Sequence, residues 1–431
     1  MHITREMLDA LLEGRLAPQE LVALLRDHLL DLCPVCRAEY ESHRRRLQGR
    51  TSPENLALAL DQVAARLPQV EKERKKAMEW LEEMRSLSHD ERLGRLERAR
   101  RRFRGPAFVV LLLAETRSCF ARDAPTALKW ATLAHEAAIR APVDPELFVR
   151  SLAYAGNAHR ACGGFEQAAR MLSLARQQLD RQHVTDPLVA AEVDSFLGSL
   201  YTDLRRLDDA ENVLLRGLML CRLAQDAEAA ARMLIQLANV YYYMNDPSTA
   251  AETVQQALSL LGPRSEEQVY LGARLNLAQY LFSAGKLDEA HEILAWDAEL
   301  FAGQTSFLKL RAEWLEARIL MGREELPKAE RLLTGVRAGF LETSPYDVAA
   351  VSIDLALLYY RQHRHRELRE AVSHALNVLI AHQNVHRDAL AAIQLLHQAA
   401  AEERLTAQLI VETATALQRS RGAAQADGVV H

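Results

Sequence analysis

The chain lacks the features that most often identify a membrane protein or an enzyme. Its longest strongly apolar run, Ala107–Ala114, is far shorter than the roughly 18 residues of a membrane span. The first positions carry acidic residues where a secretory leader would be apolar. It has no glycine-rich phosphate loop, nucleophile elbow or zinc-protease helix motif. We therefore expect a cytoplasmic, bacterial-type protein that spans no membrane and catalyses no reaction.

Cysteine, glycine and proline are also scarce. Five cysteines in 431 residues do not form a disulfide framework, which fits a reducing compartment. With 18 glycines and 13 prolines the chain is not of low complexity, and 49% apolar residues supply a large core. Its net charge of −5 argues against a general nucleic-acid binder.

A period near 40 residues organises the chain from about residue 106 onward. Apolar residues recur there at helical spacing, and the two-residue alternation of strands is absent. One small-residue column contains Ala127, Ala168, Ala210, Ala250, Ala290 and Ala329, followed by Leu368. A second small column, about twelve residues earlier, contains Gly156, Gly198, Ala238, Ala278, Ala317 and Ala356. A bulky column contains Leu172, Leu214, Val254, Leu294, Leu333 and Val372.

These columns fit stacked helical hairpins, because two helices approach closely only where small side chains meet. We expect the bulky column to fill the space between neighbouring hairpins. The pattern resembles the tetratricopeptide repeat (TPR), although its period exceeds the usual value of about 34. The resemblance implies an all-α fold, a right-handed TPR-like α-solenoid. It places about seven repeats in residues 106–380, a capping helical pair in 384–420 and a frayed tail in 421–431.

Residues 1–48 differ from the repeats and contain a metal-ligand pattern. Cys33 and Cys36 are separated by two residues, the spacing of half a tetrahedral zinc site. His28 is the candidate third ligand, and His2 is favoured over His43 as the fourth. A metal-free pair of buried thiols and a redox pair are the alternatives. Zinc bound by four protein ligands would be structural and would supply folding free energy.

This segment resembles the zinc-binding anti-sigma factor domain, whose hallmark is a His-x3-Cys-x2-Cys run with an upstream ligand. Here four residues, rather than three, separate His28 from Cys33. The resemblance implies a small helical zinc-finger-like module at the N-terminus, with zinc held by His2, His28, Cys33 and Cys36. It also implies a sigma factor as a possible partner.

Residues 52–104 are expected to form connecting charged helices. Within them lies an arginine-rich stretch, residues 92–104, which could contact an acidic partner or nucleic acid. A solvated helical face is the favoured interpretation. The basic run at residues 361–366 is expected to be an exposed turn. Three further cysteines are expected to be small core residues: Cys119, Cys162 and Cys221.

Local signals also predict where several helices begin. Ser88 and Glu91 have the spacing of a capping box. Asp144 and Ser344 each precede a proline, as an N-cap residue precedes the first helical position.

In TPR folds the first helix of each hairpin lines a concave groove, which suggests where a partner binds. Arginines there can hold carboxylates and aromatic residues can anchor a partner. By resemblance, Asn157 and Asn239 match positions that bond a bound peptide's backbone. The candidate groove residues are Arg150, Asn157, Arg160, Arg232, Asn239, Tyr242, Tyr243, Trp314, Arg318, Tyr360 and Arg361. Packing of the aromatic residues against the next hairpin is the alternative.

The sequence therefore predicts a non-enzymatic scaffold or adaptor that binds another protein or a peptide, with an acidic or C-terminal peptide as the natural ligand class. One alternative is a zinc-dependent, anti-sigma-like transcriptional regulator with a TPR sensor. Another is a regulatory subunit that docks a separately encoded effector enzyme.

Overall fold

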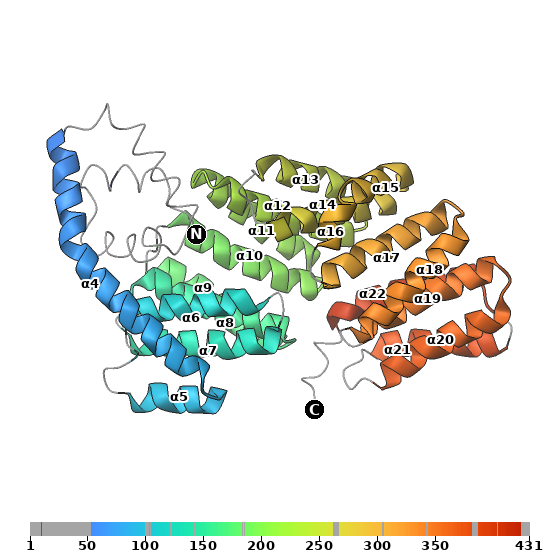
Figure 1. Ribbon diagram of the computed structural model, residues 1–431, viewed down its shortest axis with the longest axis horizontal. Helices are drawn as coiled ribbons and strands as arrows, with labels where there is room; N and C mark the ends of the chain where they lie inside the picture. Colours follow the sequence, from blue (N-terminus) through green and yellow to red (C-terminus); the bar gives the residue numbers. More distant parts are fainter. Residues whose placement is uncertain are drawn as a thin grey trace. The chain divides into compact units, whose positions relative to one another are not determined.

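The computed structural model describes Ala10 and most of residues 53–423. The gaps within that range are 100–102, 104, 121–122, 142, 183, 185, 262–266, 304–305, 342–343, 382–386 and 403. Every regular element in the described part of the chain is a helix, which confirms the all-α prediction (Figure 1). None of these helices is long and apolar enough to cross a membrane.

The helices follow one another with short connections. Two precede the repeats: α4 (Pro53–Arg85) and α5 (His89–Arg98). The first helices of successive hairpins are α6 (Pro106–Phe120), α8 (Pro145–Ala161), α10 (Pro187–Asp203), α12 (Ala227–Tyr243), α14 (Glu267–Ser283), α17 (Ser306–Gly322), α19 (Pro345–Arg361) and α21 (Arg387–Ala401). Their partners are α7 (Ala124–Arg140), α9 (Phe165–Arg181), α11 (Leu207–Leu223), α13 (Pro247–Leu260), α15 (Leu287–Trp296) with the short α16 (Ala298–Ala302), α18 (Leu326–Phe340), α20 (His365–Ile380) and α22 (Ala407–Ala423).

The chain divides into two compact units. The first runs to Leu200 and includes Asn212–Met233, and the second comprises Tyr201–Glu211 and the chain from Leu234 onward. Each unit has its own apolar core. In the first, Phe108, Leu112 and Leu133 are fully buried in one cluster. In the second, the largest cluster joins side chains of α17 through α22.

The small and bulky columns meet inside two hairpins, α8 with α9 and α10 with α11. A Cβ atom on Gly156 would lie 2.8 Å from Cγ of Leu172, and one on Gly198 would lie 2.5 Å from Cγ of Leu214. The leucine of the second helix therefore occupies the space that the glycine of the first helix leaves. At these two positions the bulky side chain packs within its own hairpin, a contact that the sequence did not predict.

A left-handed residue ends the first helix of most hairpins. Positive φ angles occur at Gly163, Arg205, Asn245, Gly285, Glu324 and His363. After each of them the next residue's N–H donates to a carbonyl five positions back, as from Gly164 to His159 and from Arg364 to Tyr359. This is the Schellman motif, which satisfies carbonyls at a helix end. The basic run at 361–366 lies at such a turn, as expected.

The three predicted N-cap residues lie at the starts of their helices, and two of them make side-chain capping bonds. Ser88 and Glu91 make a capping box at α5, with the Ser88 N–H donating to Glu91 Oε2 at 2.8 Å. Asp144 accepts a bond from the Leu147 N–H at 2.7 Å, with Pro145 as the first residue of α8. Ser344 is the N-cap residue of α19, but its side chain makes no capping hydrogen bond.

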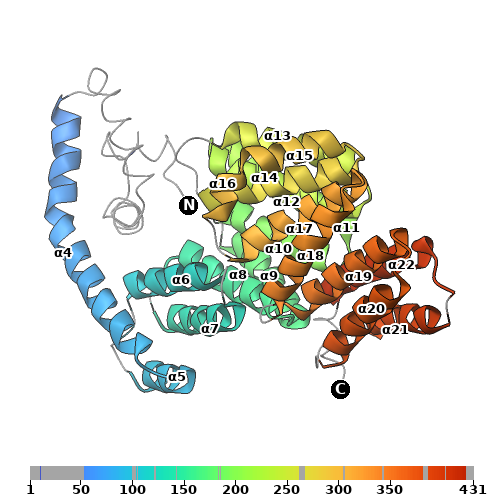
Figure 2. The ribbon, with the colours of Figure 1, turned by 45° about the vertical axis from the view of Figure 1, so that its right-hand side comes forward.

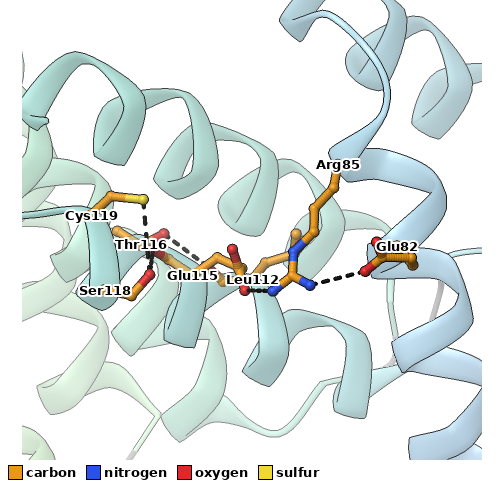
Figure 3. Close-up of polar contacts among 7 residues, drawn as sticks. All are labelled: Glu82, Arg85, Leu112, Glu115, Thr116, Ser118 and Cys119. Carbon is orange, nitrogen blue, oxygen red and sulfur yellow. Dashed lines mark hydrogen bonds and ion pairs between the residues drawn. The ribbon is translucent and has the colours of Figure 1, made fainter.

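The helix α4 is tied to the first hairpin by an arginine. Figure 3 shows Arg85 between Glu82 of its own helix, at 2.9 Å, and Glu115 of α6. On α6 itself, the hydroxyl of Thr116 donates to the Leu112 carbonyl at 2.9 Å. These contacts, with Trp80 packed edge-on against Phe103 and Phe108, join α4 to the start of the stack.

The arginine-rich stretch makes intramolecular contacts where it is described. Arg92 stacks on Trp130, 4.0 Å from the ring centroid, and donates to the Met84 carbonyl. Arg95 pairs with Glu83. The stretch therefore covers neighbouring helices with arginine stems, in line with the favoured interpretation.

The three described cysteines differ from one another in exposure. Cys221 is buried, as expected for a small core residue, and Cys119 is partly buried. Cys162 is exposed, so the expectation that it is a core residue was wrong. It follows the last residue of α8, where the chain leaves the packed part of the hairpin.

Candidate functional site

The second unit contains a pocket of about 120 Å³ formed by four helices. Three of them, α14, α17 and α19, are first helices of successive hairpins, and the fourth is α22. The lining residues of α17 are Arg311, Trp314, Leu315 and Arg318. This spacing of three, one and three places them on one helical face. We call the faces of these first helices that line the pocket the inner faces of the hairpins; two residues predicted from the sequence, Trp314 and Arg318, lie there.

Opposite charges face each other across this pocket. The Trp314 Nε1–H donates to Oδ2 of Asp354 on α19 at 2.6 Å, and Arg318 Nε lies 3.9 Å from the same oxygen. The Arg318 guanidinium also lies over the Phe282 ring at 4.8 Å. Burial raises the pKa of Asp354, and the charge of Arg318 opposes that rise. The indole and the guanidinium thus hold a carboxylate in the wall of the pocket.

The remaining walls add polar groups and small apolar surfaces. α14 contributes Asn276 and Gln279, and α19 contributes Tyr346 and the buried Asp347. α22 contributes Ala414 and Leu417. Amide, guanidinium and carboxylate groups can bond the backbone or side chain of an incoming polypeptide segment.

Other predicted residues of the second unit contact neighbouring hairpins. Asn239 Oδ1 accepts a bond from the hydroxyl of buried Tyr280 at 2.6 Å. Tyr242 packs on the Tyr280 ring, with centroids 5.0 Å apart, whereas Tyr243 is exposed and is covered on one face by Arg205 at 4.1 Å.

Near the end of α19, two further predicted residues also contact their own chain. Arg361 donates to the Met321 carbonyl at 2.9 Å. Tyr360 is partly buried against the core of the second unit.

The predicted residues of the first unit form a separate polar network. Arg150 lies 3.5 Å from Glu192 and 3.9 Å from Asp186, and Glu192 accepts a bond from the hydroxyl of Tyr154 at 2.7 Å. Burial raises the pKa of Asp186, and the charge of Arg150 opposes that rise. This network joins α8 to α10.

Three more predicted residues of the first unit bond within their own helices. Arg160 Nε donates to Asn157 Oδ1 at 2.8 Å, and Asn157 is nearly buried. Arg232 pairs with Glu228 one turn away at 3.0 Å. The structure therefore does not gather the predicted residues into one cluster, and only Trp314 and Arg318 line the pocket of the second unit.

Sequence reasoning missed several residues of these inner faces. Arg311, Tyr346, Asp347 and Asp354 line the pocket, and Tyr154 links two hairpins. Counting three, four and seven positions along each first helix would have included Arg311 with Trp314 and Arg318. Nothing in the sequence alone shows that α22 borders the pocket.

The predicted zinc ligands His2, His28, Cys33 and Cys36, and the alternative His43, lie outside the described residues. Among the residues that the structure does describe, no group of three or more histidine, cysteine or acidic side chains is arranged to hold a metal ion.

The fold defines the class to which this chain can be compared: stacks of TPR-like helical hairpins. The crystal structure of a Rap protein complexed with competence and sporulation factor aligns with a TM-score of 0.57 and 14% identity, covering 75% of this chain and 90% of that one. The apo form of RapI aligns with a TM-score of 0.53 and 14% identity, covering 71% and 85%. At these identities the likeness shows the fold alone.

One protein is similar to this chain in sequence, but over only part of each chain. The HTH-type transcriptional regulator MalT of Vibrio cholerae is 27% identical over 214 residues, which are 48% of this chain. The chain spans 23% of the length of MalT. No family model matches the chain.

Proposed function

We propose that this protein is a non-enzymatic interaction scaffold that binds a partner protein or peptide on the inner faces of its hairpins. The observation that carries the proposal is the pocket where α14, α17, α19 and α22 converge. Its walls offer aromatic, amide and guanidinium groups, which are the usual anchors of a protein interface. In the similar Rap structure, the protein is complexed with the competence and sporulation factor.

An acidic segment of the partner suits this surface best. The side chain of Arg318 is 33% exposed, whereas that of Asp354 is 14% exposed and already accepts the Trp314 bond. An approaching carboxylate therefore meets the arginine first, and a guanidinium can bond it with two N–H groups. Arg150 and Arg232 offer similar groups in the first unit.

Affinity capture with matched variants tests the proposal. We expect Arg318→Gln to weaken capture of the native partner about tenfold or more, because a charge-assisted bond in an interface is lost. Arg366→Gln is the control, since Arg366 lies on the second helix of its hairpin and is 84% exposed. Equal capture by wild type and Arg318→Gln would reject the pocket as the binding surface. Charge reversal at Arg150 and Arg232 tests the first unit in the same way.

Transcriptional regulation is the second candidate, and the partial similarity to MalT favours it. In this form of the proposal, the N-terminal segment binds zinc and a sigma factor, and the hairpins sense a peptide or protein. Capture of a sigma factor that is lost in Cys33→Ser, but retained in Arg318→Gln, would support it. Capture of an effector enzyme instead would indicate that the chain is a regulatory subunit.

A further inference from the structure

The pocket of the second unit is bounded by a helix that does not belong to the regular series of first helices. α22 is the second helix of the last hairpin, yet it packs on α19 as well as on its partner α21 (Figure 2). Ala414 and Leu417 of α22 line the pocket together with polar residues of α14 and α17. Without α22 this pocket would be an open surface on the other three helices.

The size of the pocket limits what can occupy it. Pockets for small-molecule ligands usually measure about 300–1,000 Å³. A volume of about 120 Å³ is instead suited to a single side chain. The occupant that fits is therefore one residue of a larger partner rather than a free metabolite.

The charges at the pocket favour an acidic side chain as that residue. Arg311 and Arg318 lie two turns apart on the same face of α17, with Trp314 between them. Their guanidinium groups lie 5.9 Å from the Phe307 ring and 4.8 Å from the Phe282 ring, so aromatic packing positions both. The two aspartates are less exposed than Arg318: Asp347 is 1% exposed, and the side chain of Asp354 is 14% exposed against 33% for Arg318.

The described side chains of α22 include few that are fully buried. Between residues 407 and 417, only Ile410, Thr413 and Leu417 are buried. Its middle contains four β-branched residues, which lower helix propensity: Ile410, Val411, Thr413 and Thr415. Both threonine hydroxyls bond carbonyls of the preceding turn, a pattern that slightly destabilises helices. Packing on α19 and α21, more than its own propensity, therefore holds α22 helical.

We infer that α22 completes a composite pocket for one acidic side chain of the partner, and that filling the pocket fixes α22 against α19. The inference rests on the proposed function, because it names the group that the scaffold recognises. Ligand and helix are coupled through shared contacts: whatever packs on Ala414 and Leu417 stabilises the docked helix, and the docked helix improves binding to the same extent.

Hydrogen exchange of the full chain tests the coupling, with an N-acetylated hexaglutamate peptide as the probe and hexalysine as its control. We expect hexaglutamate to slow amide exchange in α22 at least about threefold and hexalysine to leave it unchanged. Arg318→Gln should remove the effect of hexaglutamate.

A substitution can fill the pocket without any ligand. Ala414→Leu places a larger apolar side chain in the pocket wall, and we expect it to slow α22 exchange and to weaken hexaglutamate binding. Ala407→Leu is the matched control, since Ala407 is exposed on the same helix. Ala407→Leu should leave both α22 exchange and hexaglutamate binding unchanged.

The outcomes separate the two proposals. If hexaglutamate does not bind but Ala414→Leu slows α22 exchange, the coupling stands and the acidic ligand class is wrong. If hexaglutamate binds and neither it nor Ala414→Leu changes α22 exchange, α22 is a fixed cap and the inference is overturned.

Discussion

At the scale of single residues, buried charges are the most sensitive points of this molecule. Asp194 on α10 is fully buried, and Arg216 on α11 meets its carboxylate with two nitrogens at 2.5 and 2.7 Å. Arg176 on α9 lies 3.7 Å away. A buried carboxylate is tolerated because it is paired, so removal of Arg216 leaves Asp194 with Arg176, at 3.7 Å, as its neighbouring cation.

We therefore expect Arg216→Met to lower the free energy of unfolding by about 2 kcal/mol, as measured by urea denaturation, because two charge-assisted bonds to Asp194 are lost while Arg176 remains. Arg170→Met is the control, because Arg170 and Glu166 form an exposed pair one helical turn apart. Its expected cost is below about 1 kcal/mol. Equal effects of the two substitutions would show that Asp194 does not depend on Arg216.

The buried Asp354 predicts a pH dependence of stability. Its pKa is raised by burial, so the folded state holds the proton more tightly than the unfolded state does. The associated stabilisation is complete below the unfolded pKa and is lost as pH rises through the folded value. Asp354→Asn keeps an acceptor for Trp314 and removes the titration.

The unfolding free energy of Asp354→Asn, relative to wild type, should therefore increase between pH 4 and pH 7. Urea titrations at both values measure it. A difference that is constant across this range would contradict the raised pKa of Asp354.

Zinc binding by the N-terminal segment stays a prediction from the sequence. We expect about one equivalent of zinc in protein purified without chelator, because Cys33 and Cys36 have zinc-site spacing. Elemental analysis of Cys33→Ser should show loss of that zinc. Cys162→Ser is the matched control, since Cys162 is exposed on the repeats. Less than about half an equivalent in the unsubstituted protein would count against the site.

At the scale of the helical hairpin, the turn residues limit stability. His363 has a φ of 58°, a conformation that costs a non-glycine residue about 1 kcal/mol. Its side chain is exposed. His363→Gly should therefore raise the free energy of unfolding by roughly 1 kcal/mol, as measured by thermal or urea denaturation.

The opposite substitution is the control for this prediction. Gly285 has a φ of 81°, and a Cβ there would meet nothing within 4 Å. Gly285→Ala should destabilise through the backbone alone. If His363→Gly lowers stability, the left-handed turn is not the limiting feature.

The hairpins could be predicted because their pattern is local and repeated. Small residues such as Gly198 and bulky ones such as Leu214 recur at fixed spacing, and the structure brings these two into contact. The contact within the hairpin was not predicted, because spacing along a chain does not state which helix a side chain faces. The N-cap position of Ser344 was predicted correctly, although its side chain makes no capping bond.

At the scale of the whole molecule, the binding surface was only partly predictable. Trp314 and Arg318 were identified because they lie on a first helix, and they line the pocket. Asn239 was predicted to bond the backbone of a bound peptide, whereas in the structure it accepts a hydrogen bond from Tyr280 of the next hairpin. Whether a polar side chain is already bonded within the chain depends on contacts between residues about 40 positions apart, and a single sequence does not reveal these contacts.

The central claim about this protein is that a partner binds on the inner faces of its hairpins. Site-specific photocrosslinking in cells tests this most directly, with a photoreactive residue placed at Gln279 or at Gln255. Gln279 lines the pocket, whereas Gln255 is exposed on α13, the second helix of its hairpin. We predict a covalent partner adduct from position 279 and none from position 255. An adduct from position 255 alone would contradict the account.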